Sequence, residues 1–206
     1  MPQIIQYSNA DTACLQSGGN SNYGTSQNMS IDSSGSAGRF GAVNFNLTTL
    51  PANVRIDSAT LEVIKYSGAA TAMNLRADRF TGSWTETGMT WNNAPAATND
   101  GNPTTYISAN ATYSLNVTKS VQAWADGAGR FGLKLVPTSG SLTYFRSREY
   151  SWISVKLTIN YTEIPNMQVN IGDSWRAPSQ VYVNVGDVWR TVPEAWVNVG
   201  DTWRKL

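Results

Sequence analysis

The chain has 206 residues and a mass of 22.4 kDa, enough for one domain with a sizeable core or for one domain plus an appendage. Only 14% of the residues are charged and the net charge is +1, so no strong field draws the protein to nucleic acid or to an anionic membrane. There is no histidine, and Cys14 is the single cysteine, which excludes histidine-dependent triads, histidine zinc sites and intramolecular disulfides. We therefore expect no enzymatic activity.

The N-terminus lacks the basic and apolar regions of a signal peptide, and no stretch reaches the ~20 apolar residues of a membrane span. Short runs rich in Val, Ile, Thr and Tyr alternate instead with Gly, Asn, Ser and Pro, which is typical of an all-β protein. The clearest run is 154–161, where Val155, Leu157 and Ile159 share one face of a strand. Further strands are expected at 40–47, 59–64, 75–80, 113–117 and 131–136. This pattern predicts a jelly-roll β-sandwich over residues 1–162.

One short helix interrupts the predicted strands after residue 118. Val121, Trp124 and Ala125 have helical spacing, and Gly127 can end the helix. We expect this helix to pack on one end of the sandwich.

The segment Gly82–Pro95 is too rich in Gly, Thr and Asn for a regular strand, yet it contains two tryptophans. We expect an ordered loop that Trp84 and Trp91 anchor. Glu86 is expected to accept hydrogen bonds from backbone N–H groups that no strand ladder satisfies.

Several short motifs follow one another through residues 1–162. They are Asp11-Thr12, Tyr23-Gly24-Thr25, Phe45-Asn46-Leu47, Leu50-Pro51, Ile56, Ser58, Ala59, Leu61, Trp84-Thr85-Glu86, Thr90-Trp91, Asn93, Pro95, Val117-Thr118, Val121, Trp124 and Ser147-Arg148-Glu149. Together they resemble the DNRLRE-domain proteins, bacterial surface and secreted modules classed with a family of carbohydrate-binding modules. The resemblance implies a jelly roll that binds polysaccharide, often acidic, without catalysis of its own. It also implies structural roles for Trp84, Glu86, Trp91, Trp124, Arg148 and Glu149; Asn46 stands where the family usually has Asp.

Arg148 and Glu149 admit two interpretations, a pair that contacts sugar or a structural pair at the rim of the sandwich. Neighbouring residues of a strand face opposite sides and cannot line one pocket, which favours the structural pair.

Sugar recognition needs an exposed aromatic face and a few convergent polar groups. Four aromatic residues outside the core pattern are candidates, with one arginine as a contact to a carboxylated sugar: Tyr66, Tyr106, Tyr144, Trp152 and Arg146. Their spacing does not show whether they converge. Jelly rolls often carry a calcium ion, and the acidic residues that could contribute to such a site are Asp11, Asp32, Asp57 and Asp100. They form no Asp-x-Asp cluster, so no metal or cofactor is expected.

The region 163–206 repeats one octapeptide three times, in copies that begin at Val169, Val183 and Val197. Each copy has a two-residue Gly-Asp loop between β-prone residues, which predicts a type II′ hairpin. The turn residues are Gly172, Asp173, Gly186, Asp187, Gly200 and Asp201. In the second copy this register pairs Val183 with Arg190 and Val185 with Val188.

Isolated hairpins are marginal in water, and these carry a set of aromatic residues that needs cover: Trp175, Tyr182, Trp189, Trp196 and Trp203. Two interpretations are open. The hairpins pack on the sandwich, or they form an assembly interface with copies of the chain, a trimer above all, or with another protein. The second is favoured. The octapeptides also resemble those that end tail and other structural proteins of bacteriophages.

The combined expectation is a non-enzymatic bacteriophage virion protein, assembled in the host cytoplasm as a decoration, fibre or tail-associated component. Its sandwich would contact host-surface polysaccharide, and its repeats would contact copies of itself or other virion proteins. The alternative is a carbohydrate-binding module from a secreted polysaccharide-degrading enzyme or a cell-surface adhesin.

Overall fold

The structure, a computed structural model, describes residues 2–34, 38–52, 54–68, 72–151, 153 and 155–163, together with the backbone of short strands in the C-terminal repeats. Its contacts divide the chain into two units, Met1–Thr162 and Glu163–Leu206. Each unit is described by itself.

The first unit is built almost entirely from strands, with one α-helix among its described residues. The elements are β1 (Gln3–Tyr7), β2 (Ala10–Leu15), a 3₁₀ turn (Gln16–Gly18), β3 (Asn28–Ile31), β4 (Arg39–Asn44), β5 (Val54–Gly68), β6 (Met73–Phe80), β7 (Ala97–Thr98), β8 (Thr105–Ile107), β9 (Ala111–Asn116), α1 (Thr118–Ala125), β10 (Leu133–Ser139), β11 (Thr143–Arg146) and β12 (Val155–Glu163). The all-β prediction is confirmed.

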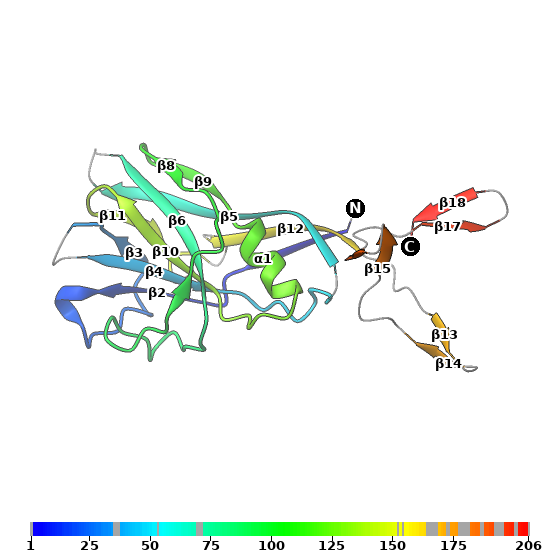
Figure 1. The fold of residues 1–206 in the computed structure, drawn as a ribbon. Helices are drawn as coiled ribbons and strands as arrows, with labels where there is room; N and C mark the ends of the chain where they lie inside the picture. The colour runs from blue at the N-terminus through cyan, green and yellow to red at the C-terminus, as the bar shows by residue number, and fades with distance from the viewer. Residues whose placement is uncertain are drawn as a thin grey trace. The chain divides into compact units, whose positions relative to one another are not determined.

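The strands form two antiparallel sheets (Figure 1). Sheet A has the order β1-β12-β5-β11-β3, with β9 also paired to β5. Sheet B has the order β2-β4-β10-β6-β7, with β8 also paired to β6. Chain neighbours therefore alternate between the sheets at several points, as in a jelly-roll sandwich.

The main core lies between the sheets. Leu61 and Val63 of β5 and Leu157 of β12 are fully buried in it, together with Leu133 and Leu135 of β10. On β12 the apolar residues alternate with half-buried polar ones, as the sequence predicts. Every second residue of these strands therefore lies on the outer face of its sheet.

The helix α1 closes one end of this core. Val121 and Trp124 are buried, and α1 contacts β5. The Asn116 side chain accepts the Thr118 N–H at 3.0 Å, while the Thr118 hydroxyl accepts the Ala59 N–H and so ties the helix to β5. Gly127 follows with a φ of 101°. Among the described residues, no helix is long and apolar enough to cross a membrane.

A second, smaller core covers the outer face of sheet B. Cys14, Phe40 and Phe80 are buried there, beneath the loop that links β6 to β7. Trp84 and Trp91 of that loop pack against them. The outer face of sheet B is thus partly covered, whereas no second core of this kind lies over the outer face of sheet A among the described residues.

The second unit contains three two-stranded hairpins. They are formed by β13 (Val169–Ile171) with β14 (Ser174–Arg176), β15 (Tyr182–Val185) with β16 (Val188–Thr191), and β17 (Trp196–Val199) with β18 (Thr202–Lys205). The register predicted for the second copy is confirmed, since Val183 pairs with Arg190 and Val185 with Val188. The six Gly-Asp turn residues lie outside the described residues, and of the aromatic interface residues only the backbone is described.

Candidate functional site

The outer face of sheet A gathers aromatic residues from separate strands. Tyr66 lies on β5, where it alternates with the inward-facing Lys65, and Tyr144 lies on β11 between the buried Thr143 and Phe145. The centroids of the Tyr66 and Tyr144 rings are 6.3 Å apart, and the rings are tilted by 55°. The sheet therefore brings together two of the predicted sugar-binding aromatics.

Arg146, two residues after Tyr144 on the same face, inserts its guanidinium between two tyrosine rings. Its Cζ atom lies 3.6 Å from the centroid of the Tyr66 ring and 3.5 Å from that of Tyr150. Tyr150 belongs to the turn after β11, and 52% of its surface is exposed. This stack of Tyr66, Arg146 and Tyr150, with Tyr144 beside it, is called the aromatic platform below.

Cation–π contacts with two rings restrict the position of the guanidinium. Within the described part of the chain, its recorded hydrogen bond is a long one to Asn28, at 3.5 Å, and no carboxylate forms a salt bridge with it. Arg146 thus supplies a fixed, uncompensated positive charge to an open surface.

A hollow of about 300 Å³ continues the same face along β5. Its lining residues are Tyr7, Glu62, Ile64, Thr112, Ile153 and Lys156. Lys156 and Glu62 form an ion pair across it. Because Glu62, Ile64 and Tyr66 are alternate residues of one strand, the hollow and the aromatic platform share a surface about 13 Å long.

The other predicted sugar contacts do not join this face. Tyr106 lies on β8 opposite Asn74 of β6, so it belongs to sheet B, where it is 65% exposed. Trp152 lies outside the described residues. Tyr150, Glu62 and Lys156 are additions that sequence reasoning missed. Tyr150 directly follows the Ser147-Arg148-Glu149 motif, but only the folded turn brings its ring into contact with the guanidinium of Arg146.

The loop from 82 to 96 holds a second hollow, of about 290 Å³, beside Trp84 and Met89. The Trp84 indole donates a hydrogen bond to the Phe131 carbonyl at 2.7 Å. Asn93, also in the lining, accepts the Thr90 N–H and donates to the Gly88 carbonyl. The polar groups of Trp84 and Asn93 are therefore engaged in hydrogen bonds within the protein.

Glu86 of the same loop meets Asp11 of β2 and the turn after β11. Its Oε1 accepts the Asp11 N–H at 2.9 Å, a backbone partner of the kind predicted. Arg148 donates to both oxygens of Glu86, from Nε at 2.6 Å and from Nη2 at 2.5 Å, and this pairing raises the pKa of Arg148. Arg148 also forms a salt bridge with Glu149, at 3.1 Å.

Arg148 and Glu149 lie in a turn rather than in a strand, so the rule that neighbouring strand residues face opposite sides does not apply to them. Both side chains point to one cluster, which holds the loop, β2 and the turn together. Of the four aspartates considered for calcium, only Asp11 belongs to it. Asp32, Asp57 and Asp100 have separate partners.

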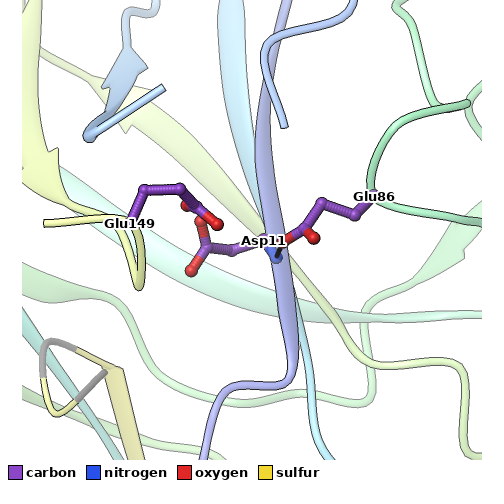
Figure 2. Close-up of side chains that lie close together, drawn as sticks. All are labelled: Asp11, Glu86 and Glu149. Atoms are coloured by element: carbon purple, nitrogen blue, oxygen red, sulfur yellow. Dashed lines mark hydrogen bonds between the residues drawn. The ribbon is translucent and has the colours of Figure 1, made fainter. Parts of the chain in front are cut away.

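Asp11, Glu86 and Glu149 each offer a carboxylate oxygen, and these oxygens lie within 4.8 Å of one another (Figure 2). Asp11 is 1% exposed. Burial, with smaller contributions from Glu149 and Glu86, raises the pKa of Asp11 to about 7. The cluster therefore stores negative charge in a poorly solvated place, where it is costly unless compensated.

A two-sheet antiparallel sandwich with one open, aromatic face is an architecture of carbohydrate-binding modules. The model of carbohydrate-binding module family 96 matches residues 3–161, and the chain belongs to this family. The match covers the whole sandwich and stops before the repeats. No curated protein matches the chain.

Proposed function

We propose that the chain binds polysaccharide through the outer face of sheet A, with the aromatic platform as its principal contact. The observation that carries the proposal is the stack of Tyr66, Arg146 and Tyr150. Exposed tyrosine rings suit the C–H faces of sugars, and a preorganised guanidinium suits an anionic group at the ring's edge.

The charge balance of this face favours an acidic polysaccharide. Lys156 is neutralised by Glu62, whereas Arg146 has no recorded carboxylate partner among the described residues. A carboxylated sugar stacked on Tyr150 would bring its anionic group to the guanidinium. The hollow along β5 extends the site, so that it can hold further sugar units of the same polysaccharide.

The setting we propose is a bacteriophage virion, in which the sandwich contacts host-surface polysaccharide and the repeats attach the protein to its copies or to other virion proteins. The support comes from the sequence: three octapeptides like those of phage structural proteins follow the binding module. A module from a secreted enzyme or adhesin is the alternative, and in it the repeats would serve as a tether.

The binding proposal is tested with the full chain on a panel of neutral and acidic polysaccharides. We expect retention by acidic members, and a loss of about fivefold or more in affinity for Tyr66→Ala, since a stacked ring contributes on the order of 1 kcal/mol or more. Tyr106→Ala is the matched control, because Tyr106 is an exposed tyrosine of the opposite sheet. Equal losses in both variants, or no retention by any polysaccharide, would contradict the proposal.

A further inference from the structure

Among the described residues, two carboxylate oxygens in the cluster of Asp11, Glu86 and Glu149 have no hydrogen-bond donor. Asp11 Oδ2 accepts the Arg148 N–H at 2.9 Å and the Ser8 hydroxyl at 3.2 Å, but Asp11 Oδ1 is buried and has no partner among the described residues. Glu149 Oε2 is buried and unpartnered in the same sense. Buried acceptors without donors are rare in folded proteins, and each needs an explanation.

The two unpartnered oxygens belong to carboxylates that face one another. Figure 2 shows the carboxyl groups of Asp11 and Glu149 pointing together, while Glu86 approaches Asp11 from the other side. The two acidic side chains therefore converge on one spot instead of turning apart, as like charges would without something between them.

Arg148 cannot supply the missing positive charge. Its Nε and Nη2 are committed to Glu86, and it is the one cation recorded in salt bridges with these carboxylates among the described residues. With all three carboxylates ionised, one guanidinium leaves two negative charges, which a divalent cation balances. A proton on Asp11, whose pKa is raised to about 7, is the competing way to lower this charge, and it leaves one negative charge in place.

We infer that Asp11 and Glu149 bind a divalent cation of calcium's class, through Asp11 Oδ1 and Glu149 Oε2. The donor set is entirely oxygen, as hard cations require, and a calcium ion completes its shell with water or carbonyl oxygens. Oxygens on opposite sides of calcium are about 4.8 Å apart, against about 4.2 Å for magnesium. The oxygens of the cluster lie within 4.8 Å of one another, a separation that calcium can span. Carboxylates from three separate segments also suit the flexible coordination of calcium better than the strict octahedron of magnesium.

The cation would also fix part of the polysaccharide site. Glu149 directly precedes Tyr150, whose ring covers Arg146 on the outer face of sheet A. A bond from Glu149 to an ion on β2 anchors the turn that carries Tyr150. The inference itself does not depend on sugar binding, because it stands on the cluster alone.

The test uses the full chain, stripped with a chelator and titrated with calcium chloride in a calorimeter and by thermal unfolding. We expect one calcium ion per chain and a rise in Tm of about 5–10 °C at a hundredfold excess over Kd. Glu149→Gln should weaken calcium binding at least about tenfold, because it removes an anionic ligand. Glu163→Gln, an exposed glutamate outside the cluster, is the matched control and should bind as the unaltered chain does.

Asp11→Asn should abolish the calcium-dependent rise in Tm. If that variant fails to fold, Glu149→Gln decides alone, since Glu149 is partly exposed. The inference is overturned if millimolar calcium gives neither heat nor a Tm shift, or if Glu149→Gln binds as tightly as the control. A third result would also overturn it: a lower pH, 5 instead of 7, raises the Tm of the stripped chain, and calcium raises the Tm no further. In that case a proton on Asp11, and not a cation, compensates the charge of the cluster. Magnesium binding as tight as calcium's would overturn the choice of ion.

Discussion

Arg146 is the residue on which the proposed sugar site depends most, because its guanidinium contacts two tyrosine rings. A lysine keeps the charge but lacks the planar group that stacks on two rings. We expect Arg146→Lys to lower the affinity for the retained polysaccharide by about tenfold while leaving thermal stability nearly unchanged. Arg55→Lys, at the far end of β5, is the control in the same titration. An unchanged affinity for Arg146→Lys would show that charge alone suffices.

Burial makes the thiol of Cys14 unreactive. The residue is 0% exposed, and burial raises the pKa of its thiol to about 12. The nucleophilic thiolate is therefore almost absent at neutral pH. We expect no alkylation of the native protein by iodoacetamide at pH 8 and full alkylation in denaturant, as read by mass spectrometry. Modification of the native chain at an equal rate would show that the small core over sheet B opens readily.

At the residue scale, the sequence offered the right aromatic types but not their neighbours. Tyr66, Tyr144 and Arg146 were candidates because they lie outside the core pattern of the sequence. Tyr150 was not singled out, since it lies in a turn where no strand periodicity indicates the direction of a side chain. Asp11 and Glu149 are 138 positions apart in the sequence, so no local spacing could reveal that their carboxylates meet.

Among the elements, the loop from 82 to 96 depends on a close approach to Gly24. A Cβ atom at Gly24 would collide with the backbone carbonyl of Glu86. Asn22 fixes the same stretch by donating to the Glu86 and Met89 carbonyls, each at 2.7 Å. A side chain at position 24 must therefore push the Glu86 backbone off its place.

We expect Gly24→Ala to destabilise the protein by about 1–3 kcal/mol, the usual cost of overpacking. Urea unfolding measures the change, and Thr87→Ala, at an exposed position of the same loop, is the control. A loss no larger than that of the control would mean that the loop shifts freely and does not hold the Arg148–Glu86 pair in place.

For the hairpins, a separate prediction concerns the turn residues Gly172, Gly186 and Gly200. A type II′ turn needs a positive φ at its first position, and a β-branched residue is penalised there. Replacing all three glycines by valine should disrupt the hairpins and any assembly through them, while the sandwich stays folded. Circular dichroism and size measurement together check this; unchanged assembly would contradict the proposed turns.

For the whole molecule, we expect the sandwich alone and the full chain to differ in oligomeric state. The sandwich has its own core, and we expect a chain that ends at Thr162 to be a folded monomer. The full chain carries three hairpins with aromatic side chains and is expected to form an oligomer, a trimer above all. Light scattering of the two proteins at equal concentration decides this. If both are monomers, the repeats do not mediate self-assembly.

By itself, the sequence determined the fold class and the hairpin pairing. Alternation along β12 and the Gly-Asp turns of the repeats are local patterns, with periods that the backbone geometry of a strand or hairpin imposes. Strand ends were less certain: Phe45 and Leu47 are buried although β4 ends at Asn44, because a loop can turn apolar side chains inward as well as a strand does.

Only the tertiary structure decided which face of the sandwich is open and which charges meet. The loop over sheet B packs Trp84 and Trp91 against Phe40 and Phe80, whereas the tyrosines of sheet A stay accessible on its outer face. The aromatic platform and the carboxylate cluster both join residues far apart in the chain. Their contacts depend on strand order and on how loops cross the sheets, which distant parts of the sequence set together and no local pattern records.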